Sequence, residues 1–116
     1  MEIKEAKLLR IFVGELDKIG RTPLYEKIVY KAKENRLAGA TVLRGIMSYG
    51  PKHVIHTSKL LSLSEDLPVI IEILDEESKI NGFLPVVQEL LTQAQTGGMS
   101  TIEHVQYISY PFQKTE

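Results

Sequence analysis

Apolar and polar positions alternate in four separate stretches of the chain, and such alternation is typical of β-strands. The pattern predicts strands over residues 7–15, 40–49, 68–75 and 100–110. The third stretch is rich in β-branched side chains, which favour strands. Gly50 and Pro51 end the second strand, and Pro111 ends the fourth. Residues 52–66 fit a strand as well as a helical turn, so their structure stays open at this stage.

Two other stretches repeat apolar residues at the spacing of a helix. The first helix is predicted from Thr22 to about residue 36, with Thr22 as its N-cap and Pro23 at its first helical position. The second is predicted over residues 76–92, with an apolar stripe of Ile80, Phe83, Leu84, Val87 and Leu91. Because Pro85 lies inside it, either the helix kinks there or its regular part begins near Gly82.

The resulting order of elements is βαββαβ, which is the ferredoxin-like plan. We therefore predict an α+β fold in which residues 1–116 form a single domain. Right-handed crossovers would put both helices on one face of a four-stranded antiparallel sheet.

The other face of this sheet would have no helix to cover it. The helix side would carry Leu9, Ile11, Val13, Val69, Ile71 and Ile73. The open side would carry Leu8, Arg10, Phe12, Val42, Arg44, Ile46, Ile70, Glu72 and Leu74. An apolar face of roughly several hundred Å² is unusual on a monomer. We therefore expect a homo-oligomer whose open faces pack together, with the charged residues of that face paired.

Charge and composition exclude several classes of function. The formal net charge of the 116 residues is -1, which argues against a nucleic-acid-binding module and against a polybasic membrane binder. The chain contains no cysteine, so disulfides, thiolate zinc sites and cysteine nucleophiles are ruled out. The charged N-terminus does not resemble a signal peptide, and a cytoplasmic protein is expected.

Two adjacent glycines, Gly97 and Gly98, follow the second predicted helix. Such a pair allows positive φ and lets the backbone approach another molecule without a Cβ in the way. Consecutive N–H groups in such a turn can bind a phosphate. A helix C-cap followed by a tight turn would give the same residues, so the pattern alone leaves both readings open.

Three segments together resemble the PII signal-transduction proteins: Leu43-Arg44-Gly45-Ile46, residues 66–73 and residues 94–97. The whole chain is similar to the uncharacterised PII-like proteins of bacteria and archaea. The resemblance implies a non-enzymatic regulatory homotrimer with its open sheet faces inward. It also implies that an adenine nucleotide (AMP, ADP or ATP) binds between subunits and that the 51–66 loop engages a partner protein, for example a transporter or an enzyme. The residues that match the nucleotide cleft are Gly45, Met47, Ser48, Tyr49, Thr96, Gly97, Gly98 and Met99.

The chain departs from the PII pattern around the phosphates. The phosphate-binding loop is shortened to Thr96-Gly97-Gly98-Met99 and contains no lysine, and Met47 stands where PII has a second glycine. Residues 52–66 contain no tyrosine that could be modified. The phosphate charge would have to be met by Lys52, by Arg44 or by another basic residue.

Two alternatives remain beside this reading. His53 and His56 have a spacing that metal ligands can use, which would suit a metal-binding trimer similar to the CutA proteins. No third ligand is near in the sequence, so no metal site is assigned. An enzyme of the dimeric α+β barrel type would need a paired acid and base, and we find no such pair and assign no catalytic residue.

Overall fold

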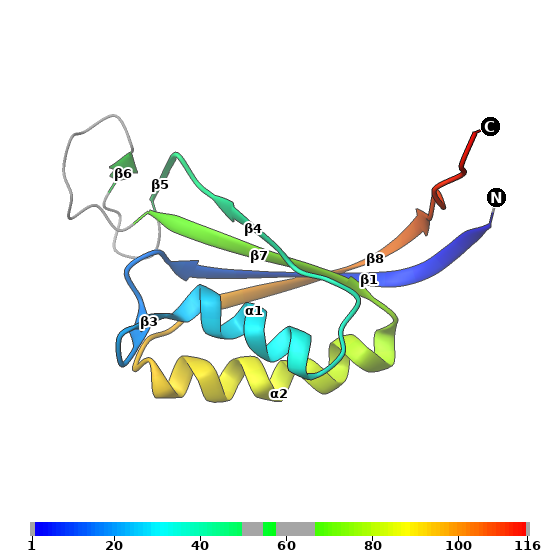
Figure 1. The fold of residues 1–116 in the computed structure, drawn as a ribbon. Coiled ribbons are helices and arrows are strands. Elements are labelled where there is room, and N and C mark those ends of the chain that lie inside the picture. The colour runs from blue at the N-terminus through cyan, green and yellow to red at the C-terminus, as the bar shows by residue number, and fades with distance from the viewer. Residues whose placement is uncertain (1, 50–54, 58–66, 116) are drawn as a thin grey trace.

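The main sheet has four antiparallel strands, and β1 (Ile3–Gly14) is the longest of them. The computed structural model describes residues 2–49, 55–57 and 67–115. The strands lie in the order β4 (Thr41–Arg44), β7 (Pro68–Asp75), β1 and β8 (Met99–Ile108). Figure 1 shows β1 and β8 continuing together beyond the helices, toward the two termini. The predicted α+β sheet is thereby confirmed.

Both long helices, α1 (Leu24–Glu34) and α2 (Glu77–Gln93), lie on the same face of this sheet (Figure 1). The register pairs Leu9 with Ile73 and Ile11 with Ile71, and all four side chains are fully buried under the helices. The helix-side prediction is confirmed at each of its six positions. The core consists of Leu9, Ile11, Val13, Leu24, Ile28, Ala32, Val69, Ile71, Ile73, Ile80, Phe83, Val87 and Leu90. Each fully buried large aliphatic side chain contributes about 1.5–3 kcal/mol.

The start of α1 differs from the prediction. The helix begins at Leu24, its N-cap is Pro23, and no side chain caps it. Thr22 belongs instead to β3 (Thr22–Pro23), which forms a small hairpin with β2 (Lys18–Ile19). The N–H of Leu24 donates to the carbonyl of Asp17 at 2.8 Å, so this hairpin satisfies a donor that Thr22 was predicted to help cap.

The second helix is continuous through Pro85. Since α2 begins at Glu77, a regular helix starting only near Gly82 is wrong. No helix in the described residues is long and apolar enough to cross a membrane.

The predicted second strand is wrong in its continuity. It consists of two strands, β4 and β5 (Met47–Tyr49), and β5 pairs with β6 (Ile55–Thr57) outside the main sheet. The break falls at Gly45, whose N–H donates to the carbonyl of Pro68 at 2.8 Å. Pro68 is the first residue of β7, so β4 leaves the sheet at the point where its partner strand begins.

The predicted side of β4 is also wrong. Thr41 pairs with Glu72 and Leu43 pairs with Ile70, so Thr41 and Leu43 belong to the open face. Val42 and Arg44 pair with residues of the helix side. Because side chains alternate along a strand, a one-residue error in register exchanges the two faces.

Candidate functional site

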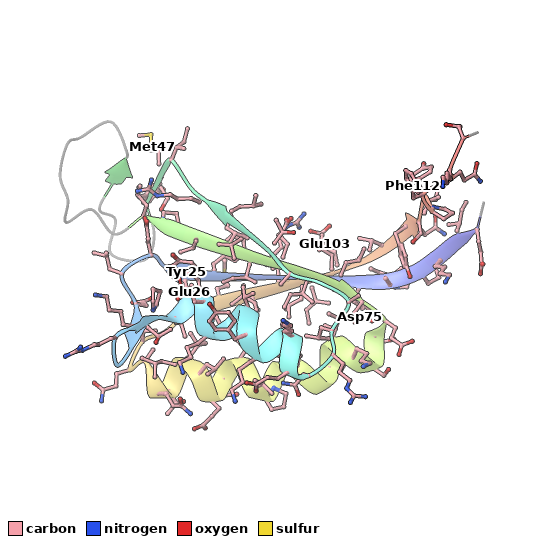
Figure 2. All side chains as sticks on the ribbon, in the orientation of Figure 1. Tyr25, Glu26, Met47, Asp75, Glu103 and Phe112 are labelled. Atoms are coloured by element: carbon pink, nitrogen blue, oxygen red, sulfur yellow. The ribbon has the colours of Figure 1, made fainter. Side chains whose placement is uncertain are left out.

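The first group of predicted binding residues lies where the edge strand β4 leaves the sheet. Gly45 is packed so closely on Pro68 that an added Cβ would lie 2.6 Å from the Cγ of the proline ring. Any other residue would require the proline ring or the backbone to shift. Beyond Gly45, Met47 and Tyr49 are 60% and 66% exposed, while Ser48 is half-buried. In Figure 2, Met47 lies beyond the sheet on the side away from the helices.

The second group follows α2, and its backbone differs from the prediction. Gln95, with φ of 54°, is the left-handed residue, so positive φ at Gly97 and Gly98 is wrong. The N–H of Gln95 donates to the carbonyl of Thr92, and the N–H of Thr96 donates to the carbonyl of Leu91. This pair of bonds is a Schellman cap. The cap is thus complete before Gly97 and Gly98, and neither glycine is needed to end the helix.

The purpose that the contacts support for Gly98 is close packing. An added Cβ would lie 3.1 Å from the carbonyl oxygen of Phe12 and 3.2 Å from Cδ2 of Leu91. Gly98 therefore allows the chain to pass between α2 and β1 as it enters β8. Gly97 has no atom within 4 Å of an added Cβ.

The two groups lie at the same end of the sheet but at opposite edges. Gly45 adjoins Pro68, which pairs with Gly14 near the end of β1, and Met99 pairs with Phe12 in the same region. The first group leaves from β4 and the second enters β8, with β7 and β1 between them. Three strand spacings separate these edges by about 14 Å. Within one chain, the two groups of residues are therefore too far apart to contact the same phosphate.

The ion pairs partly match the sequence prediction. Arg10 Nε donates to Glu72 Oε2 at 2.8 Å, as expected for the open face. Arg10 also donates to Glu103 on β8, a partner that was not predicted from the sequence. The bond to Glu72 and then that to Glu103 raise the pKa of Arg10 above its usual value. Figure 2 shows Glu103 on the side of the sheet away from the helices.

Arg44 pairs with a residue that was not predicted as its partner. Its Nε donates to Oε2 of Glu15 at 2.9 Å, at the end of β1. The expected pairing of Arg44 on the open face is wrong, because Arg44 lies on the helix side of β4. The register of β4 against β7 is the signal that would have found Glu15, and it is not readable from the sequence of β4 alone.

The open face is apolar on both sides of the Arg10 ion pairs at its centre. Leu8, Phe12, Ile70 and Leu74 are half-buried, and Leu43 is 44% exposed. Near the start of β4 this face contains a groove of about 530 Å³, lined by Leu8, Leu74, Glu72 and residues 38–41. The face therefore keeps the apolar character that suggested an oligomer.

The described residues contain no cluster of three potential metal ligands. His53 and Lys52 lie outside the described residues, as does the side chain of His56. His104 on β8 forms a hydrogen bond with Glu5 on β1.

Sequence comparison identifies a family and several relatives to which the chain is similar. Residues 6–107 match the family DUF190, described as "Uncharacterized ACR, COG1993". A UPF0166 protein of Aquifex aeolicus (strain VF5) is 40% identical over 108 residues, which are 93% of this chain and 98% of that protein. A UPF0166 protein of Methanocaldococcus jannaschii is 39% identical over 87 residues, which are 75% of this chain and 80% of that protein.

PII-like proteins are among the solved structures to which the chain is similar in fold. CPII, a nitrogen regulatory PII-like protein from Thiomonas intermedia K12, was solved bound to ADP, AMP and bicarbonate. It has a TM-score of 0.68 with 15% identity, and the match covers 91% of each chain. A PII-like protein from Thermus thermophilus has a TM-score of 0.65 with 19% identity, covering 93% of this chain and 94% of that one. At these identities the likeness is one of fold.

Proposed function

The chain belongs to the DUF190 family, and we propose that it is a PII-like regulatory protein that binds an adenine nucleotide between the subunits of a homotrimer. The fold shared with CPII, which binds ADP and AMP, supports the class of ligand. A regulatory role rather than catalysis, and a cytoplasmic location, are parts of the same proposal.

The observation that carries the proposal is the position of the two residue groups at opposite edges of one end of the sheet. In a closed ring, each subunit presents one surface to the next subunit and a different surface to the previous one. A neighbour whose β8 edge meets the β4 edge would therefore join the two groups. The combined site would consist of Gly45, Met47, Ser48 and Tyr49 of one subunit with Thr96, Gly97, Gly98 and Met99 of the next.

The open face supports the trimeric part of the proposal. Ile70 pairs with Phe12 on one side and with Leu43 on the other, so these three side chains form an apolar strip across three strands. Packing such strips around an axis would remove them from water, and each Å² of apolar surface that is buried would stabilise the assembly by about 25 cal/mol. The Arg10 network adds a paired charge to this face rather than an unpaired one.

The partner of the regulatory protein is proposed to bind through the 51–66 loop, most of which lies outside the described residues. The nucleotide would control this binding if its affinity differed between two states of the loop. A tenfold difference in affinity corresponds to about 1.4 kcal/mol of coupling.

The proposal is tested by measuring the mass of the native assembly and its thermal stability with AMP, ADP and ATP. A trimer is expected, and a nucleotide at 100 times its Kd should stabilise the protein by about 2.7 kcal/mol. Ile70→Asp should dissociate the trimer, because it places an unpaired charge in the apolar strip. Gln88→Asp, at an exposed position of α2, is the matched control and should leave the trimer intact.

Two results would contradict the proposal. A monomeric wild type would remove the subunit interface, and absence of both a thermal shift and calorimetric binding with all three nucleotides would remove the ligand. Zinc and copper are included in the screen, since stabilisation by metal alone would favour the CutA-like alternative.

A further inference from the structure

An ion pair joins the ends of two strands that are not neighbours in the sheet. Arg44 is the last residue of β4, Glu15 follows the last residue of β1, and β7 lies between these strands. Arg44 Nε lies 2.9 Å from Glu15 Oε2, so the ion pair crosses the start of β7. The Arg44 side chain is 57% exposed and that of Glu15 is 32% exposed, so solvent and a dissolved anion can reach the pair.

Backbone hydrogen bonds from the same two places hold the first residues of β7. The N–H of Glu15 donates to the carbonyl of Leu67, and the N–H of Gly45 donates to the carbonyl of Pro68, each at 2.8 Å. Leu67 is 1% exposed. We call these five residues (Glu15, Arg44, Gly45, Leu67 and Pro68) the β7 clasp. The backbone bonds fix the position of Arg44, while its side chain is held by a solvent-accessible pair.

Arg44 differs in this respect from Arg10, the other arginine paired in the sheet. Arg10 donates to two carboxylates, those of Glu72 and Glu103, and its side chain is 32% exposed. Removing Arg10 from these partners would leave two carboxylates on the open face without their cation. Arg44 is more exposed, and an exposed arginine–carboxylate pair contributes little because water competes for both groups.

A phosphate group can replace Glu15 as the partner of Arg44. Guanidinium groups bind phosphate through two parallel N–H···O bonds, and a phosphate carries more negative charge than one carboxylate. Arg44 directly precedes Gly45, the first residue of the proposed binding group, and Thr96-Gly97-Gly98-Met99 contains no cation. Arg44 is therefore the cation closest in sequence to the proposed site, and its exposed pair with Glu15 is readily exchanged for another anion.

We propose that Arg44 binds the phosphate of the nucleotide and gives up Glu15 when it does so. The inference rests on the proposed function and adds to it the residue that recognises the anion. Glu15 then acts as an internal competitor, which keeps Arg44 in place in the empty protein and lowers the affinity for phosphate. Because Glu15 also donates its N–H to Leu67, the exchange takes place within the clasp that holds the start of β7.

The experiment compares calorimetric affinities for adenosine, AMP, ADP and ATP among the wild type and four variants. Arg44→Gln should weaken binding of the three phosphorylated ligands roughly tenfold or more while adenosine binding stays unchanged. Arg44→Lys should restore part of the loss, since it keeps the charge but not the two-bond geometry. Glu15→Gln should strengthen nucleotide binding by roughly two- to fivefold, because it removes the competitor.

Lys33→Gln is the matched control for the loss of one positive charge, since Lys33 is an exposed residue in the last turn of α1. It should leave all four affinities unchanged. Native mass and melting temperature of each variant establish that it folds and assembles as the wild type does. If Arg44→Gln fails to fold, Glu15→Gln still decides the question, because a competing carboxylate predicts a gain in affinity for the three nucleotides with no change for adenosine, and unchanged nucleotide affinity would overturn the inference.

The outcomes separate this inference from the proposed function. If the wild type binds none of the ligands, the nucleotide function is wrong. If the wild type binds nucleotides and Arg44→Gln binds them equally well, the inference alone is overturned. Equal loss of adenosine and nucleotide affinity in Arg44→Gln, or weaker nucleotide binding in Glu15→Gln, would also overturn it.

Discussion

Replacing Gly45 by alanine tests the contact that ends β4. The added Cβ would lie 2.6 Å from Cγ of Pro68, and 3.4 Å from both Cδ and the carbonyl oxygen of the same residue. Carbon atoms pack best at about 3.5–4.0 Å, so roughly 1 Å must be gained at the first of these contacts. The proline ring has little freedom to move away.

The backbone cannot relieve this clash without a further loss. The carbonyl of Pro68 accepts the N–H of Gly45 at 2.8 Å, so moving the two residues apart lengthens that bond. Overpacking of this kind costs about 1–3 kcal/mol. For a chain of this size the expected decrease in melting temperature is about 4–12 °C.

Gly97→Ala is the matched control, because nothing lies within 4 Å of its added Cβ. Both substitutions remove one glycine from the unfolded chain, so the difference between them isolates the contact with Pro68. Gly97→Ala should leave stability unchanged or increase it by about 0.4–1 kcal/mol. Melting temperatures are compared by calorimetry at one protomer concentration, since assembly shifts them. Equal melting temperatures for the two variants would refute the packing argument.

Two further predictions concern the end of α2 and the carboxylate of Glu5 on β1. Gln95→Gly should stabilise the protein by about 1 kcal/mol in chemical denaturation, because Gln95 is left-handed and glycine takes φ of 54° without strain. Gln88→Gly, inside the same helix, should have the opposite sign, and a loss of stability in both variants would contradict the assigned cap. A hydrogen bond with Gln106, and to a smaller extent one with His104, holds the pKa of Glu5 below its ordinary value of 4.5. The stabilisation is therefore complete above pH 4.5 and is lost as the pH falls through the lower folded pKa, and Gln106→Leu should raise the Glu5 pKa measured by NMR.

The parts of the fold that the sequence predicted correctly are those where one side of an element is buried. The alternation in β1 and β7 identified the helix-side residues because a buried side tolerates few polar groups. The bounds predicted for the third strand, 68–75, agree with β7 (Pro68–Asp75). The apolar stripe of α2 is likewise read directly from its spacing, since Ile80, Phe83 and Val87 are buried.

The second strand could not be predicted in the same way, because its four residues are all exposed. Thr41-Val42-Leu43-Arg44 offers no clear alternation, so the side chains themselves do not determine which face they occupy. Register was set instead by pairing with β7, a contact between residues far apart in sequence. The end of β4 depends on the bond from Gly45 to Pro68, which is equally non-local.

Because non-local contacts determine the fold here, the site residues could be proposed from a resemblance, but their positions relative to one another could not be predicted. Gly97 and Gly98 were predicted from local sequence to allow positive φ, and this was wrong because the cap of α2 is formed earlier, at Gln95. That the two groups lie at opposite edges follows only from the strand order. Glu15 was missed because its role depends on the side of β4 that Arg44 occupies.

The separation of the two groups also determines how binding and assembly depend on each other in the proposed trimer. If each nucleotide contacts the β4 edge of one subunit and the β8 edge of the next, a free subunit offers only part of the contacts. The free energy by which assembly strengthens nucleotide binding then equals the free energy by which the nucleotide strengthens assembly. A binding site contained within one subunit would lack this reciprocity. The dependence of nucleotide affinity on protomer concentration therefore distinguishes a site shared between sheet edges from one located on a single chain.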